Sequence, residues 1–315
     1  MKYFITIDEQ VALLKSRGLI IDDEDLAKKT LFRYNFYKVI NGTYKIFTDN
    51  EKSKYYPNTK FEYLIEVYKF DKEIKKKLLG ATLEVERILR SIVSYKFMEK
   101  HPEKAAYLDY RNFDNSNNIA KSNILSFEKA INQFREEINY HKSINHYLNK
   151  YGSVPLWFII NFISFGKLIT FFESLKMEEK FEIADEFEGF VEENIEEEIR
   201  FRLSPRILKS FLENAKELRN ICAHDNLILG YTFELENIYY KPIHDIWQKE
   251  ENEKRNQLFD TFLILQALLP KDQFNSINQS MLKRINRLRE RIPKKAFIKV
   301  MDSIGFPIDY NGDIL

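Results

Sequence analysis

Apolar residues in this chain recur every three or four positions over long stretches, which is the spacing of one face of an α-helix. The longest stretch runs from Phe61 to Leu79, and beyond Gly80 the same period continues to Val93. We expect a kink at Gly80, because glycine weakens a helix interior. The pattern predicts an all-α protein, with further helices over residues 6–18, 119–148, 178–198, 204–224, 256–269 and 273–288.

Capping signals place several helix ends. Thr6–Glu9 resembles a capping box at the start of a helix that stops at Gly18, and Asp22–Asp25 caps a second short helix. Ser204–Pro205 opens a later helix, because proline has no amide hydrogen to leave unpaired in the first turn. Polar and turn-forming residues predict a loop over residues 112–118 and a break over residues 151–155.

The most apolar run, Val154 to Phe172, is the one segment to weigh as a membrane span. It contains Asn161 and Lys167, whereas a span prefers about 20 mostly apolar residues without such a charge. We therefore expect a buried core helix and no membrane partner. Gly230 to Pro242 is rich in β-branched and aromatic residues and predicts a short strand or an extended loop.

Basic and acidic residues are nearly equal in number, but they are concentrated in different segments of the chain. The 49 basic and 48 acidic side chains give a formal net charge of +1, so any RNA site must be a local patch. Residues 178–198 hold eleven acids and one lysine, whereas residues 283–299 hold eight basic residues and one acid. Only 9 glycines and 8 prolines in 315 residues favour long helices over many short strands.

Several functional classes find no support in the residue pattern. The single cysteine excludes an internal disulfide and suits a reducing cytoplasm, and Met1–Thr6 lacks the apolar core of a secretory leader. Phosphate-loop and serine-hydrolase motifs are missing. We expect neither a metal ion nor another cofactor, because no metal-binding spacing joins His101, His141, His146 and His244.

The candidate chemistry lies in Arg219-Asn220-Ile221-Cys222-Ala223-His224, at the end of a helical stretch. Histidine moves protons near neutral pH, and arginine holds phosphate with a fixed fork of donors. Together they suit metal-independent attack of an RNA 2′-hydroxyl on its own phosphate, a route closed to DNA. The alternative is an ordinary helix end, at which histidine favours the helix dipole.

The spacing constrains how such a site could work. Residues five apart lie about 140° apart around a helix, so Arg219 and His224 cannot share one face, whereas Asn220 and His224 can. A working site needs an Arg219 side chain that bends around the helix, a distorted last helical turn, or residues from two chains. Cys222 and His224, two apart, point in nearly opposite directions and cannot pair in one chain, so we expect Cys222 to be a small buried residue.

Residues Glu217–Asp225 resemble the signature of the Abi-type (abortive infection, AbiD/AbiF-like) proteins of the HEPN superfamily. The resemblance covers nearly the whole chain, because further matching segments are spread along it. These segments are Gln10–Ile21, Asn35–Lys38, Phe61–Asp71, Glu86–Ser91, Pro155–Trp157, Ser164–Gly166 and Gly305–Pro307.

This resemblance implies a HEPN-type helical bundle with additional N- and C-terminal helices. It implies one unit over residues 1–315, with a HEPN-like core over roughly 60–230 and a C-terminal helical extension over roughly 240–315. Such proteins are usually dimeric, act in bacterial phage defence, and in some cases accompany structured noncoding RNA. The catalytic pair would be Arg219 and His224, with Asn220 polar beside them.

Other positions receive a role by the same resemblance. Glu86 and Arg90 would brace the site, or else form a simple ion pair on one helix. The chain departs from the family pattern at Asp225, where a second histidine is commoner. Asp225 would either repel phosphate or orient His224.

The basic segment from Lys283 to Lys299 is the best candidate RNA surface, with Phe297 offered for stacking. The alternative is a solvated helix face. The residues assigned to RNA binding are Lys283, Arg284, Arg287, Arg291, Lys294 and Lys295.

Two functions are carried forward. The first is a cytoplasmic, homodimeric, metal-independent endoribonuclease of phage defence. The second is a non-catalytic or silenced protein that binds a structured noncoding RNA, as in antitoxin-like control. A third and weaker reading, a toxin silenced by nucleotide transfer, needs a tyrosine where this chain has Asn226.

Overall fold

In the computed structural model, residues 4–49, 54–114, 119–136, 142–196 and 200–312 are described. They are almost entirely helical, as the periodicity predicts. The α-helices are α1 (Ile7–Ser16), α2 (Glu24–Tyr34), α3 (Gly42–Phe47), α4 (Phe61–Lys100), α5 (Ile119–Glu136), α6 (Lys142–Tyr151), α7 (Leu156–Ile159), α8 (Phe165–Ser174), α9 (Met177–Ile195), α10 (Pro205–Ala223), α11 (Lys241–His244), α12 (Leu258–Leu263), α13 (Lys271–Arg291) and α14 (Lys294–Ile304).

Short elements join these helices. A π-helical turn, Tyr37–Asn41, links α2 to α3, and 3₁₀ turns occupy residues 106–108, 110–112, 160–162, 245–247 and 264–267. The two-residue strands β1 (Thr48–Asp49) and β2 (Lys54–Tyr55) pair antiparallel, with Thr48 opposite Tyr55.

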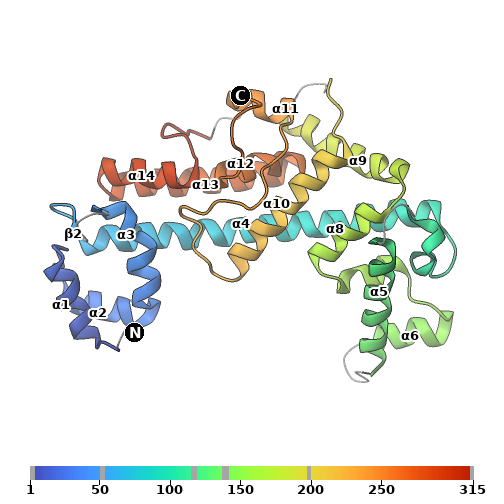
Figure 1. Cartoon of the computed structure of the whole chain (residues 1–315), viewed down its shortest axis with the longest axis horizontal. Coiled ribbons are helices and arrows are strands. Elements are labelled where there is room, and N and C mark those ends of the chain that lie inside the picture. The colour runs from blue at the N-terminus through green and yellow to red at the C-terminus, as the bar shows by residue number, and fades with distance from the viewer. Residues whose placement is uncertain (1–3, 50–53, 115–118, 137–141, 197–199, 313–315) are drawn as a thin grey trace.

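Helix α4 is the axis on which the other elements are arranged (Figure 1). It is 40 residues long, and it packs most extensively against α13 along one side and against α10, which crosses it. The sequence predicts a kink at Gly80, and the structure shows that α4 is one continuous helix through this exposed glycine. Burial of apolar positions on both sides of Gly80, among them Leu78 and Val85, outweighs the weak intrinsic preference of one residue.

The predicted caps are confirmed. The Thr6 hydroxyl accepts from the Glu9 amide at 3.3 Å, and the Glu9 carboxylate accepts from the Thr6 amide at 2.6 Å. Asp23 caps α2, and Gly18 takes a positive φ of 88° where the chain turns after α1. The predicted loop over residues 112–118 lies partly outside the described residues.

The apolar run Val154–Phe172 is not one helix, which corrects the sequence prediction. It forms α7, a 3₁₀ turn and α8, and Ser164 caps α8 by accepting from the Lys167 amide. The turn is stable because the guanidinium of Arg90 donates to the carbonyls of Ile160 and Ile163. Residues 119–148 likewise divide between α5 and α6, and residues 256–269 between the short α12 and a 3₁₀ turn.

The C-terminal part contains helices that periodicity did not predict, the four-residue α11 and, after Pro293, the longer α14. Residues 230–240 form a loop without a strand, and the predicted segment ends in α11 at Lys241 and Pro242. Buried apolar side chains make one continuous cluster that draws on every part of the described chain from Val11 to Tyr310. Among the described helices, none has the length and apolarity required to cross a membrane.

Candidate functional site

Helix α10 carries the predicted motif to the surface at its C-terminal end. Ser204 caps its start by accepting from the Ile207 amide, and a buried stripe that includes Phe211 and Leu218 holds it against α4. The helix ends at Ala223, and the backbone amide of His224 closes it by donating to the Asn220 carbonyl at 3.0 Å. The motif is thus fixed by a packed helix although its side chains are partly in solvent.

The guanidinium of Arg219 lies against a carboxylate on α4. Its Nε is 3.9 Å from Oε2 of Glu86, and its Nη1 donates to the side-chain oxygen of Asn220 at 3.1 Å. Glu86 is 10% exposed and Arg219 is 34% exposed, so one side of the guanidinium faces the carboxylate and part of it stays accessible. Glu86 therefore sets the direction in which Arg219 points.

Arg90 holds Glu86 from its other side. The two residues form an ion pair through Oε1 of Glu86, and Arg90 also donates to the Ile163 carbonyl at 2.7 Å. The pair is thus part of a cluster of Arg90, Glu86 and Arg219 that ties α4 to α10 and to the turn between α7 and α8. Two guanidinium groups and one carboxylate leave this cluster with one excess positive charge, as a phosphate site requires.

Asn220 and His224 are both exposed, and the structure separates His224 from Arg219. The Arg219 side chain turns toward Glu86 and Asn220, whereas His224 stands at the cap beyond the last helical turn. Among the described residues, no hydrogen bond joins the two side chains, and none orients the His224 imidazole. One chain therefore presents an arginine and a histidine that are near in sequence but are not hydrogen-bonded to each other.

Asp225 begins a tight turn just after the histidine, with a positive φ of 52°. Its carboxylate accepts from the Lys38 ammonium through Oδ2 and from the Lys75 ammonium at 2.8 Å through Oδ1. Lys75 also donates to the Asn226 carbonyl at 3.0 Å and pairs with Asp71 at 2.7 Å. Asp225 therefore anchors the turn to α4 and to the N-terminal segment.

The buried end of this network fixes the chain that follows. Asp71 is 1% exposed, and its carboxylate accepts from the Ile228 amide at 3.0 Å. Sequence reasoning found Asp225 but missed Lys38, Asp71 and Lys75. Asp71 and Lys75 do stand four apart on a helix, which is a signal for an ion pair but not for its distant partner.

The charge of Asp225 predicts an acid-sensitive contribution to stability. Burial opposes ionisation, but hydrogen bonds from Lys38 and Lys75 lower the pKa of Asp225 to about 2, from an ordinary value near 3.8. A lowered folded-state pKa stabilises the fold above pH 4 and loses that effect as pH falls toward 2. Because the carboxylate is 42% exposed, solvent screening reduces the contribution to about 1 kcal/mol.

We therefore expect Asp225→Asn to lower the free energy of unfolding by about 1 kcal/mol at pH 7 and by progressively less at pH 4 and pH 3. Urea unfolding at the three pH values measures the difference. The exposed Asp309→Asn is the matched control and should match the parent throughout. A difference that stays constant with pH would contradict the assignment.

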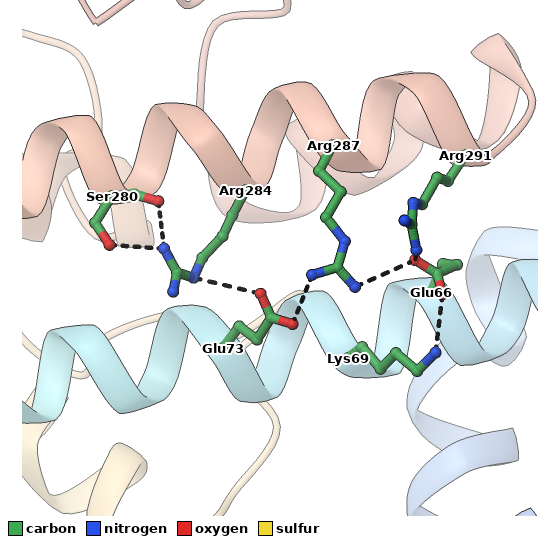
Figure 2. A network of polar contacts seen from close by, with 7 residues as sticks. All are labelled: Glu66, Lys69, Glu73, Ser280, Arg284, Arg287 and Arg291. Atoms are coloured by element: carbon green, nitrogen blue, oxygen red, sulfur yellow. Dashed lines mark hydrogen bonds and ion pairs between the residues drawn. The ribbon is translucent and has the colours of Figure 1, made fainter.

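The fold gives the residues of the basic segment, 283–299, different environments. Arg284, Arg287 and Arg291 point from α13 to Glu66 and Glu73 on α4, as Figure 2 shows, with Arg287 and Arg291 each reaching a carboxylate at 3.0 Å. These arginines are engaged in ion pairs within the chain. Lys283, Lys294 and Lys295 are exposed. The prediction that Phe297 is available for stacking is wrong: it is buried, with Arg289 over its ring.

The cysteine and the histidines His101 and His244 lie in buried or hydrogen-bonded environments. Cys222 is free and buried, as predicted, and burial raises the pKa of its thiol to about 12. Burial lowers the pKa of His244 to about 4, and the His101 ring lies 3.0 Å from Glu179. The described part of the chain contains no group of three or more histidine, cysteine or acidic side chains placed to hold a metal ion.

The family model of Abi-like proteins matches residues 29–229, which is more than half of the chain and extends from α2 through the turn after α10. Curated proteins and solved structures give no significant match.

Proposed function

The chain belongs to the family of Abi-like proteins, and from this premise we propose that it is a metal-independent endoribonuclease of bacterial phage defence. Cleavage would use Arg219 and His224, and the substrate would be RNA within the cytoplasm. The observation that carries this proposal is the accessible end of α10, where a positively charged arginine cluster and an exposed histidine are held on a packed scaffold.

The chemistry follows from the two side chains. An RNA 2′-hydroxyl loses its proton and attacks the adjacent phosphorus, and the bond to the 5′-oxygen of the next nucleotide breaks as that oxygen gains a proton. Arg219, backed by Glu86, stabilises the charge that develops on the phosphate oxygens. His224 carries one of the two protons, and the products end in a 2′,3′-cyclic phosphate and a 5′-hydroxyl.

The reaction needs two proton transfers, whereas each motif contains one histidine. This difference favours a site built from two chains. A two-fold axis near the exposed end of α10 would bring two histidines and two arginines around one phosphate. We therefore propose a homodimer, for which sedimentation should give twice the 37.8 kDa mass of the chain. A monomer that cleaves RNA would exclude this arrangement.

A second candidate function has its own observation. Since no described residue orients the His224 imidazole, the same cluster could bind phosphate without cleaving it. The protein would then bind a structured noncoding RNA. Binding would weaken with added salt, because binding releases counterions from the RNA and this release is less favourable at high salt.

The experiment that separates the two uses purified protein, RNA and a chelator. Cleavage in excess chelator, with cyclic phosphate ends and no cleavage at a site carrying a single 2′-deoxy nucleotide, supports the nuclease. Salt-sensitive binding without products supports the second function. Cleavage that stops on chelation contradicts the metal-independent mechanism.

A further inference from the structure

A cavity of about 250 Å³ opens directly beside the motif. Its walls come from three separate parts of the chain: the π-helical turn that begins at Tyr37, the face of α4 that carries Tyr68, and the turn from Asp225 to Leu227. Asp225 follows His224 in the chain, so the cavity adjoins the proposed reaction site. Its volume is below that of a pocket for a drug-sized molecule and suits one small ring system.

The charges in this cavity do not favour a phosphate. Two ammonium groups, those of Lys38 and Lys75, face two carboxylates, those of Asp71 and Asp225, so the formal charges cancel. Each ammonium already pairs with a carboxylate at hydrogen-bond distance. A ligand without charge fits this environment better than an anion.

The remaining wall groups are those that recognise a planar, polar ring. Tyr37 is 68% exposed and offers an aromatic face for stacking. Leu227 adds an apolar contact to the cavity wall, and it lies close to Gly42, where a Cβ would be 3.1 Å from Cδ1 of Leu227. The amides of Asn41 and Asn226 also line the cavity.

Asp225 adds selectivity to this wall. Each of its oxygens accepts one lysine hydrogen bond, and each keeps a further lone pair. A carboxylate only accepts, so it pairs with the exocyclic amino group of cytosine or adenine. Uracil offers only its ring N3–H, which lies between two carbonyl oxygens that the carboxylate repels. The π-helical turn at Tyr37–Asn41 is a rare conformation that often marks functional sites.

We propose that this cavity binds one unpaired nucleobase of the RNA beside the phosphate held at the motif, and that it prefers a base with an exocyclic amino group. The inference rests on the proposed function for its RNA ligand. Tyr37 stacks on the base, and Asp225 accepts a hydrogen bond from the amino group. The cavity thus selects which nucleotide lies next to the motif.

The test uses fluorescent 2′-O-methyl RNA decamers of C, A or U, which bind but lack the attacking hydroxyl. We expect the parent protein to bind the C and A decamers about tenfold more tightly than the U decamer. Tyr37→Ala should weaken binding of all three by about tenfold, and Tyr37→Phe should bind as the parent does. Asp225→Asn should lose the preference against U, because an amide also donates.

Tyr110→Ala is the matched control, since Tyr110 is exposed to a similar degree but lies beyond the far end of α4. Equal binding of the three decamers by the parent, or unchanged binding by Tyr37→Ala, would overturn the cavity assignment. Cleavage of ordinary RNA is measured separately. Base preference without cleavage would support the base-binding cavity and contradict the proposed nuclease. Cleavage without base preference would support the nuclease and contradict the base-binding cavity.

Discussion

Replacing His224 with alanine should lower the rate of RNA cleavage by about 10²- to 10⁴-fold, which is the usual contribution of a general acid or base. The fold should be unaffected, because the side chain is exposed and the helix cap uses only its backbone amide. Single-turnover cleavage in the presence of a chelator measures the rate, and thermal unfolding of the same sample measures the fold.

The control for this substitution is His146→Ala, which removes an exposed histidine on α6, away from the motif. It should leave cleavage and the unfolding temperature as they are in the parent. Retained cleavage by His224→Ala would place the active site elsewhere. Lost cleavage together with an unfolding temperature several degrees lower would show a structural defect rather than lost chemistry.

The sequence predicted those features that depend on neighbouring residues. The Thr6 capping box, the start of α10 at Ser204 and the burial of Cys222 each follow from residues within a few positions. The expected single helix over residues 154–172 is wrong for the opposite reason, because its interruption depends on a distant residue. Packing of α4 overrides one glycine, and Arg90 on α4 stabilises a turn some 70 residues further along the chain.

The basic segment shows why charge patterns alone mislead. Arg284, Arg287 and Arg291 repeat at helical spacing and read as a solvated or RNA-facing stripe. Their partners, Glu66 and Glu73, are seven apart on α4, so the two helices present matching rows of opposite charge (Figure 2). The packing of α13 on α4, more than 200 residues away in sequence, places these arginines in ion pairs with Glu66 and Glu73.

Part of the proposed site has a local sequence signal. The arginine and histidine belong to one short motif, and the Glu86–Arg90 ion pair joins residues four apart on one helix. The supports for the turn after the motif lie about 150 and 190 residues away, at Lys75 and Lys38. Such a contact has no local signal, because any exposed lysine could serve.

Replacing Lys75 with methionine should lower the free energy of unfolding by about 3–5 kcal/mol, the usual cost of breaking a buried ion pair. Lys75 is 6% exposed, and its ammonium is shared among Asp71, Asp225 and the Asn226 carbonyl. Burial favours the neutral amine, but Asp71 and Asp225 together hold the pKa of Lys75 above its ordinary value. Methionine would leave the Asp71 carboxylate buried with only backbone donors.

We also expect Lys75→Met to reduce RNA cleavage, because the turn that Lys75 holds begins one residue after His224. Urea unfolding measures the stability, and RNA cleavage below the unfolding transition measures the site. Lys76→Met, an exposed neighbour on α4, should change stability by no more than about 0.5 kcal/mol. Adding Asp71→Leu to Lys75→Met should recover part of the stability, since no buried carboxylate is then left unpaired. If Lys75→Met unfolds like Lys76→Met, the network does not hold the turn, and the position of His224 must depend on α10 alone.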